Sequence, residues 1–282
     1  KEKYGFQKAY GSYEELIEDP EVEAVYIPLP NTMHYDWTIK TLKRGKHVLC
    51  EKPLAPTEEQ AKEMFAVAEE NQVYLMEAFA YQHSPYLTAI REEIEQGVIG
   101  DIRYMESAYI TSDYNKENIR MRKETLGGCT YDLGVYNTSL ILRILGEEPE
   151  SVSAIAEFSE EKIDTLTSVI LKYKDGKKAA FSCGMTLATD LDRHIDRFEI
   201  QGTKGSIKGT EFDFNGDGEL SYTITRFDGD EEVKKVIVPQ NYRLEVEQLG
   251  RCVVGEEVPA VTKEFSLANA RMIDQILKEI HY

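Results

Sequence analysis

Long hydrophobic runs and a surplus of basic residues are both missing from this sequence of 282 residues. No apolar stretch approaches the ~20 residues that an α-helix needs to cross a bilayer. Lysine and arginine total 33, against 51 aspartate and glutamate residues, so the formal net charge is −18. Nucleic acids and anionic membranes bind basic surfaces. The charge balance therefore argues against both as partners.

Cysteine is also scarce. The four cysteines lie far apart in the sequence and form no C-x-x-C pair. Structural zinc sites and disulfide frameworks use closely spaced cysteines. We therefore expect no metal site, and we expect free thiols, which suit the reducing conditions of the cytoplasm. The chain is long enough for two domains with substantial cores.

The first 81 residues alternate between short apolar runs and helical segments. The runs at residues 24–30, 46–53 and 73–79 have the composition of buried parallel strands. The segments between them place apolar residues at helical spacing. Strands that are separated by single helices form βαβ units around a parallel sheet. The sequence therefore predicts an α/β domain over residues 1–81.

A glycine-rich turn is absent from this first domain. A dinucleotide-binding Rossmann fold begins with a strand and a G-x-G-x-x-G turn that seats the pyrophosphate. No such pattern occurs here, and residues 1–5 have the pattern of the end of a helix followed by its terminal glycine. We therefore expect an incomplete Rossmann-type sheet, which lacks a first βαβ unit of on the order of 40 residues.

Residues 82–282 predict a second domain of the α+β class. A strand is expected at residues 102–110, and alternating apolar and polar residues from 151 to 238 predict consecutive hairpins in a large, mostly antiparallel open sheet. Helices near 242–254 and 266–280 close the domain. An open sheet of this kind commonly packs against another subunit. We expect a homodimer or homotetramer that forms through this sheet.

Charged residues follow the apolar run that ends at Cys50. The sequence there reads Glu51-Lys52-Pro53, and ligands of open α/β sheets bind at the carboxyl ends of the strands. The proline restricts the backbone after the lysine, which favours a fixed direction of the ammonium group into a cleft. The alternative is a Glu–Lys pair that only solvates a loop, and the spacing leaves both open.

A second polar group follows the glycine pair at residues 127–128. Asp132 and Tyr136 are four residues apart, so on a helix they share one face. A phenol with a pKa near 10 is a poor base unless a cation such as Lys52 stabilises its ionised form. The alternative is a core tyrosine beside a helix-bound aspartate. Three other polar residues could reach a substrate, but surface or helix-end positions are the favoured interpretation for them: Arg120, Arg122 and His194.

Taken in order, these motifs resemble the glucose-fructose oxidoreductase/inositol dehydrogenase/rhizopine catabolism (Gfo/Idh/MocA) family. The resemblance covers essentially the whole chain and rests on residues 30–34, 51–53, 127–136, 242–245 and 268–271. Many members carry histidine where this chain has tyrosine in Asp-Leu-Gly-Val-Tyr. That form is similar to the subgroup of glucose-fructose oxidoreductase, D-xylose dehydrogenase and dimeric dihydrodiol dehydrogenase.

The resemblance implies a reaction, a cofactor and a set of residues. It implies hydride transfer between NAD or NADP and a carbinol or carbonyl carbon of a small sugar, cyclic polyol or dihydrodiol. The acid/base would be Tyr136, assisted by Lys52, with Asp132 orienting the substrate. The residues that the resemblance implies in cofactor binding are Pro30, Asn31, His34, Glu51, Lys52 and Pro53.

Two departures from the family pattern keep other functions open. The glycine-rich turn and the residue that usually selects NAD or NADP are missing, and residues 81–85 read Tyr-Gln-His-Ser-Pro where many members have Tyr-Arg-x-His-Pro. The competing hypotheses are a non-catalytic sensor that binds a cofactor or a sugar, and an inactive fragment of an oxidoreductase.

Overall fold

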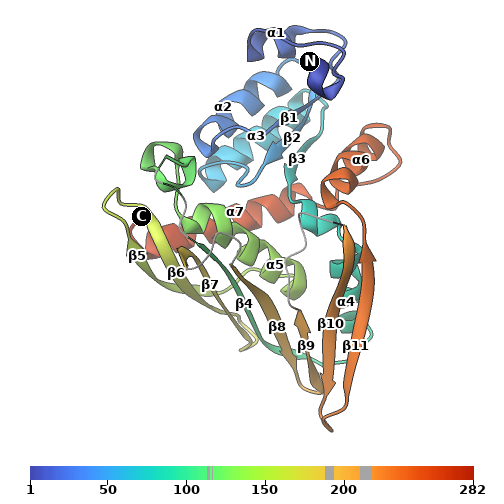
Figure 1. The fold of residues 1–282 in the computed structure, drawn as a ribbon, viewed down its shortest axis with the longest axis vertical. Helices are drawn as coiled ribbons and strands as arrows, with labels where there is room; N and C mark the ends of the chain where they lie inside the picture. Colours follow the sequence, from blue (N-terminus) through green and yellow to red (C-terminus); the bar gives the residue numbers. More distant parts are fainter. Residues whose placement is uncertain (113–114, 116, 188–193, 210–216) are drawn as a thin grey trace.

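The strands of this protein form two sheets, one of three strands and one of eight, in the part of the chain that the structure describes. The computed structural model describes residues 1–112, 115, 117–187, 194–209 and 217–282. Figure 1 shows the two sheets at opposite ends of the molecule, with α5 (Val135–Leu145) and α7 (Lys263–Glu279) between them. Within the described residues, no helix is long and apolar enough to cross a membrane.

The smaller sheet confirms the predicted βαβ pattern. Its strands lie in the order β1-β2-β3, and both neighbouring pairs are parallel. The helices α2 and α3 connect successive strands. Each helix of this domain begins after a capping residue or a proline and buries one apolar side. Thr57, for example, accepts a hydrogen bond from the backbone of Gln60 at the start of α3. The elements are α1 (Tyr13–Glu18), β1 (Ala24–Ile27), α2 (Asn31–Leu42), β2 (His47–Glu51), α3 (Glu58–Glu70) and β3 (Leu75–Ala78).

The larger sheet is mixed but mostly antiparallel, and its strand order is β11-β10-β9-β8-β4-β7-β6-β5. The prediction of consecutive hairpins was wrong at one place, because β4 inserts between β7 and β8 and pairs in parallel with β7. The short strand β9 was not predicted. The strands are β4 (Ile102–Ser112), β5 (Ser151–Phe158), β6 (Asp164–Lys172), β7 (Lys178–Leu187), β8 (His194–Gly202), β9 (Gly205–Gly209), β10 (Gly218–Arg226) and β11 (Glu231–Val238).

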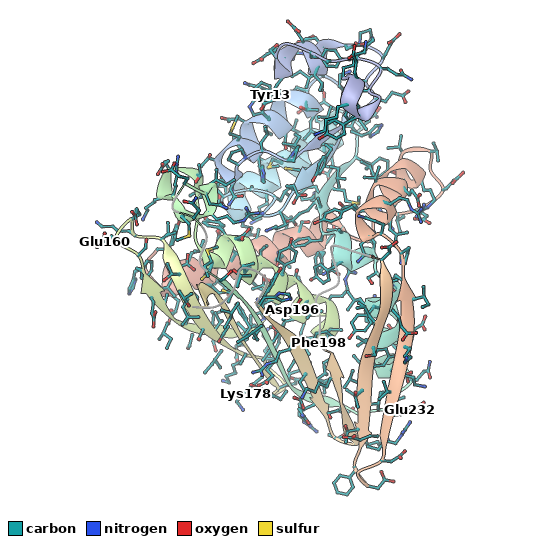
Figure 2. All side chains as sticks on the ribbon, viewed as in Figure 1. Tyr13, Glu160, Lys178, Asp196, Phe198 and Glu232 are labelled. Carbon is teal, nitrogen blue, oxygen red and sulfur yellow. The ribbon has the colours of Figure 1, made fainter. Side chains whose placement is uncertain are left out.

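Helices cover one face of the larger sheet. The packing includes α4 (Pro85–Glu95), α5 and α7, while α6 (Asn241–Val253) lies near the smaller sheet (Figure 1). Phe198 of β8, which is labelled in Figure 2, is buried, and its ring meets that of Tyr86 of α4 edge to face, with centroids 6.4 Å apart. Apolar side chains on this face form one large core, and a second core surrounds β1 to β3.

Candidate active site

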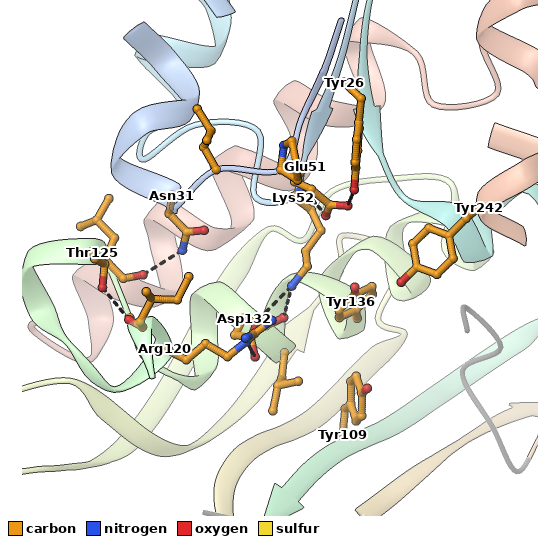
Figure 3. A pocket seen from close by; sticks show the side chains of 16 residues that line it. Tyr26, Asn31, Glu51, Lys52, Tyr109, Arg120, Thr125, Asp132, Tyr136 and Tyr242 are labelled. Carbon is orange, nitrogen blue, oxygen red and sulfur yellow. Dashed lines mark hydrogen bonds and ion pairs between the residues drawn. The ribbon is translucent and has the colours of Figure 1, made fainter. Parts of the chain in front are cut away.

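A cavity of about 400 Å³ lies at the carboxyl ends of β1 and β2, where the smaller sheet meets the start of α5. This is the edge at which open α/β sheets bind ligands, and the volume is within the range of small-molecule sites. Figure 3 shows polar side chains from both parts of the chain entering the cavity. The predicted site residues that line it are Asn31, Glu51, Lys52, Asp132 and Tyr136.

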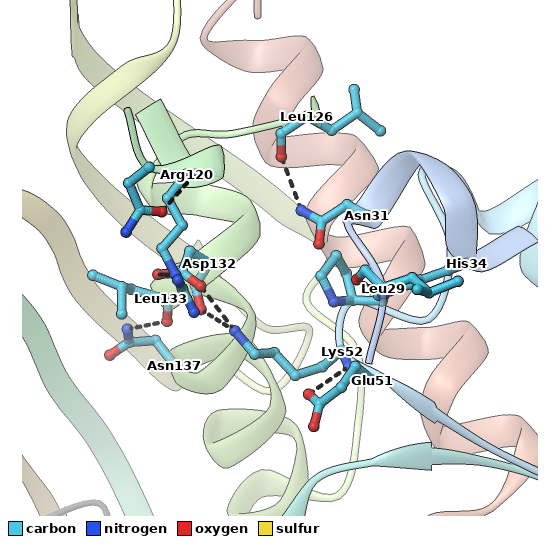
Figure 4. Close-up of polar contacts among 12 residues, drawn as sticks. Leu29, Asn31, His34, Glu51, Lys52, Arg120, Leu126, Asp132, Leu133 and Asn137 are labelled. Atoms are coloured by element: carbon cyan, nitrogen blue, oxygen red, sulfur yellow. Dashed lines mark hydrogen bonds and ion pairs between the residues drawn. The ribbon is translucent and has the colours of Figure 1, made fainter. Parts of the chain in front are cut away.

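Lys52 joins the two halves of the site. Its Nζ donates to the backbone oxygen of Asp132 at 2.7 Å and lies 3.1 Å from Oδ1 of the same residue (Figure 4). Both side chains are largely buried, at 9% and 11% exposure. The sequence prediction that Lys52 points into a cleft at the sheet edge is thus met by the geometry, whereas a lysine that solvates a loop would be exposed.

Asp132 lies in a π-helical turn, Thr130–Gly134, and not in the regular α-helix that the sequence suggested. Gly128, at φ +105°, comes just before this turn, and a Cβ there would lie 2.1 Å from Oδ1 of Asp164. Asp164 is fully buried, and its Oδ2 accepts hydrogen bonds from the backbone and the hydroxyl of Thr130. The close approach at Gly128 and these bonds fix the turn that carries Asp132. Turns of this type are frequent at functional sites.

Arg120 lines the cavity, although the sequence interpretation favoured a surface or helix-end position for it over one that reaches a substrate. Its side chain is 42% exposed, and its Nε lies 2.9 Å from Oδ2 of Asp132. Burial raises the pKa of Asp132, but the charges of Lys52 and Arg120 outweigh burial and hold that pKa below its ordinary value. Asp132 is therefore a carboxylate held between two cations. Arg120 lies in a 3-10 helix of three residues, Ile119–Met121, which is too short for hydrophobic periodicity, so no sequence pattern set it apart from Arg122.

Tyr136, the second residue of α5, lines the cavity beside Lys52. The Lys52 ammonium lies 4.6 Å from the centroid of the Tyr136 ring, and the rings of Tyr109 and Phe79 meet Tyr136 edge to face at 5.8 and 6.1 Å. Burial, and then the charge of Glu51, raises the pKa of Tyr136 well above its ordinary value. The positive charge of the nearby Lys52 does not bring the pKa of Tyr136 back down, so the phenol keeps its proton at neutral pH.

Glu51 forms an acidic border of the cavity together with residues of β1 and α6. The hydroxyl of Tyr26 donates to Oε1 of Glu51 at 2.5 Å (Figure 3). Tyr242 lines the same side, and Glu245, one turn further along α6, is 2% exposed. Burial, followed by the charge of Glu51, raises the pKa of Glu245 to about 8. No pattern in the sequence indicated that Glu245 is buried.

The remaining predicted cofactor residues lie behind the cavity wall. His34 is 1% exposed, with Nδ1 2.8 Å from the backbone oxygen of Pro53 and Nε2 2.7 Å from that of Leu29. Burial lowers the pKa of His34, although the two carbonyl oxygens favour its charged form. Its ring thereby joins the loops that follow β1 and β2. Pro30 and Pro53 belong to those loops, and neither they nor His34 are among the described residues that line the cavity.

The cavity wall fits the nicotinamide end of a dinucleotide. The Glu51 carboxylate can accept hydrogen bonds from ribose hydroxyls, and Pro28 and Leu29 offer an apolar surface to a flat ring. Asn31, the first residue of α2, adds an amide that donates to the backbone oxygen of Leu126 at 2.9 Å (Figure 4). A lysine, carboxylates and a tyrosine that meet in a cavity at the carboxyl edge of a parallel sheet are the groups expected of a nicotinamide-dependent oxidoreductase.

Comparison with known proteins identifies the family. Residues 1–79 match the model of the oxidoreductase family with an NAD-binding Rossmann fold, and residues 87–208 match that of the GFO/IDH/MocA C-terminal domain. The chain belongs to the GFO/IDH/MocA family and is an NAD(P)-dependent oxidoreductase. The resemblance drawn from the motifs is confirmed, as is the fold class of a parallel Rossmann-type sheet followed by a larger, mostly antiparallel one.

Two curated relatives and one solved structure show the range of this similarity. Trans-1,2-dihydrobenzene-1,2-diol dehydrogenase of Xenopus laevis is 32% identical, over 98% of this chain and 82% of the relative. D-xylose 1-dehydrogenase (NADP(+)) 2 of Haloferax volcanii is also 32% identical, over 96% of this chain and 82% of the relative. A 3-ketoreductase of Actinomadura kijaniata, solved with NADP and TDP-benzene, superimposes with a TM-score of 0.90 at 27% identity. The superposition covers 99% of this chain and 84% of the reductase. That reductase has also been solved with one lysine or one tyrosine replaced.

Proposed function

We propose that this protein transfers a hydride between the nicotinamide of NAD or NADP and a carbinol or carbonyl carbon of a sugar, a cyclic polyol or a dihydrodiol. The observation that carries the proposal is the meeting of Lys52, Asp132 and Tyr136 at one cavity, although 80 residues separate Lys52 from Asp132. The relatives that act on xylose and on a dihydrodiol support this range of substrates.

Tyr136 is the proposed acid/base. The bound nicotinamide supplies or accepts the hydride. In the direction of carbonyl reduction, the Tyr136 hydroxyl gives its proton to the oxygen of the substrate, while the carbon gains the hydride and the C=O double bond becomes a single bond. Solvent then returns a proton to the phenolate. The protonated state of the buried Tyr136 suits this donor role.

Lys52 is proposed to stabilise the negative charge that develops on the substrate oxygen and on the phenolate. An ammonium group has three N–H donors, and the contacts of Lys52 with Asp132 use two of them. The third donor is available for the substrate oxygen. Asp132 fixes the direction of the ammonium and orients the substrate. The solved variants of the ketoreductase, with a lysine or a tyrosine replaced, are in keeping with these roles.

The cofactor-binding role is assigned to two groups of residues. Asn31, Glu51 and Lys52 face the cavity and would contact the ribose and nicotinamide directly. Pro30, His34 and Pro53 would act indirectly, by shaping the loops that face the cofactor. We further propose that residues 1–81 form the cofactor-binding domain and residues 82–282 the substrate-binding domain.

A panel of substrates tests the proposal against a non-catalytic sensor. The absorbance of the reduced nicotinamide is followed with NAD or NADP and, in turn, aldoses, cyclic polyols and trans-dihydrodiols, while cofactor affinity is measured by titration calorimetry. Turnover with at least one class supports the enzyme. Tight cofactor binding without turnover on any class favours the sensor and contradicts the proposal.

We also propose that the larger sheet forms a homodimer or homotetramer. Its uncovered face carries a shallow hollow of about 600 Å³ lined by Ile155, Ile170 and Ile195, which are 75%, 60% and 37% exposed. Light scattering should give a multiple of the monomer mass. Ile170→Lys should reduce that mass, whereas Val258→Lys, at an exposed position between α6 and α7 and outside the sheet, should not. A monomeric wild-type protein contradicts this assembly.

A further inference from the structure

We propose that Arg120 is a positioning residue that acts through Asp132 to keep the Lys52 ammonium directed at the reacting oxygen. This inference rests on the proposed function. The two oxygens of the Asp132 carboxylate are divided between two cations, with Oδ1 3.1 Å from Nζ of Lys52 and Oδ2 2.9 Å from Nε of Arg120 (Figure 4). Each cation thus faces a different edge of the same carboxylate.

The backbone holds Arg120 in place. The amide of Gly128 donates to the backbone oxygen of Arg120 at 2.8 Å, and the side chain of Asn118 accepts from its backbone N–H at 3.0 Å. At Gly127, a Cβ would lie 2.4 Å from that same backbone oxygen, so only glycine permits this approach. The loop therefore ties Arg120 to the segment that leads into the turn of Asp132. Arg120 is part of a built site, although its side chain is partly exposed.

The charges explain what Arg120 adds. A lysine paired alone with a carboxylate forms a neutral pair, which does little to stabilise negative charge on a substrate oxygen. With Arg120 on the second carboxylate oxygen, the charge of Asp132 is shared between two cations and offsets less of the charge of Lys52, while Glu51 adds a further carboxylate to the same cavity. The Lys52 ammonium thus keeps more of its positive field at a largely buried position beside the ring of Tyr136. Fixed positive charge of this kind stabilises a developing oxyanion.

The same arrangement gives Arg120 a geometric role. Arg120 draws Oδ2 of Asp132 away from the Lys52 ammonium, which has one N–H donor remaining for the substrate. Arg120 therefore keeps that donor for the substrate oxygen. An effect of this type appears in kcat and leaves the affinity for a neutral substrate unchanged, since the contact matters most when charge develops.

Steady-state kinetics of Arg120→Gln, Arg120→Lys and Asp132→Asn test the inference with the substrate that the panel identifies. We expect Arg120→Gln to lower kcat on the order of tenfold with little change in KM, less than the loss for a group that donates directly to an oxyanion. Arg120→Lys, which keeps the charge, should recover most of the rate. Arg122→Gln is the matched control, because Arg122 lies on the same loop and pairs with the exposed Glu117.

A double-mutant cycle decides whether Arg120 acts through Asp132. In the Asp132→Asn background, Arg120→Gln should have little further effect on kcat. An equal loss in both backgrounds, a rise in KM at constant kcat, or no loss at all overturns the inference.

Thermal unfolding supplies a readout that needs no turnover. The same cycle, measured on Tm, should show that the two substitutions together cost less than the sum of each alone. Additive effects on Tm contradict the pairing of Arg120 with Asp132. If the wild-type protein turns over no substrate of the panel, the proposed function fails and the catalytic role of Arg120 fails with it, while the Tm cycle still reports on the pairing.

Discussion

Glu245 should make the stability of this protein decrease as the pH rises through the neutral range. The side chain is 2% exposed, and its Oε2 has no hydrogen-bond partner among the described residues. Burial and the charge of Glu51 raise its pKa from 4.5 to about 8. The folded protein therefore keeps a proton on Glu245 in a range where the unfolded chain has lost it.

The direction and size of the effect follow from this difference. Below about pH 4.5 both states are protonated, and Glu245 contributes no pH dependence. Between about pH 4.5 and 8 only the unfolded state ionises, so the free energy of unfolding falls as the pH rises. A gap of about 3.5 pKa units, at about 1.4 kcal/mol for each unit, corresponds to a total loss of roughly 3–5 kcal/mol. Above the pKa that Glu245 has in the folded protein, both states are ionised and the free energy of unfolding falls no further on account of this residue.

Urea denaturation of Glu245→Gln and wild-type protein at about pH 5 and pH 8.5 measures this contribution. Glutamine has a similar shape and does not titrate. We expect the variant to gain several kcal/mol relative to wild type between the two pH values. Other buried acids, such as Glu77, titrate in both proteins and cancel in the comparison. Glu247→Gln, at an exposed position of α6, should show no such gain. An equal difference between variant and wild type at both pH values refutes the reasoning.

Two further predictions concern the turn of Asp132 and the proton of Tyr136. Gly128→Ala should destabilise the protein by roughly 3 kcal/mol or more in urea denaturation, because the added Cβ meets Asp164 and the backbone is left-handed. Gly146→Ala, also left-handed but in open space, should cost only about 1 kcal/mol, and equal costs would contradict the packing argument. Because burial raises the pKa of Tyr136, initial rates of carbonyl reduction should stay constant across neutral pH and fall only in the alkaline range, while alcohol oxidation should accelerate as the pH rises. A reduction rate that falls between about pH 6 and 8 would contradict this assignment.

The sequence predicted those parts of the fold that depend on local patterns. The helices of the first domain have caps and apolar periodicity, and its strands are short apolar runs, so the βαβ order was readable. Lys52 was placed correctly at the sheet edge because it directly follows such a run. The insertion of β4 between β7 and β8 was not predictable, since it depends on pairing between segments about 75–100 residues apart in the chain.

The site was only partly predictable for the same reason. Asp132 and Tyr136 were found through their spacing, but the π-helical turn between them has no periodic signal of its own. Arg120 and Glu245 reach the site through tertiary packing alone. His34 was expected to border the cofactor, and the structure places its ring between two backbone oxygens behind the cavity wall. Its role in shaping the cofactor site stays a prediction.

Single-turnover hydride transfer in Tyr136→Phe tests the central claim most directly. The variant keeps the ring that packs against Tyr109 and Phe79 and removes only the hydroxyl. We predict unchanged cofactor affinity and a rate of hydride transfer at least roughly 100-fold below wild type, the lower bound for a lost acid/base group. Tyr104→Phe, whose hydroxyl contacts Glu106 away from the cavity, should retain the full rate. Transfer at the wild-type rate in Tyr136→Phe would contradict the account.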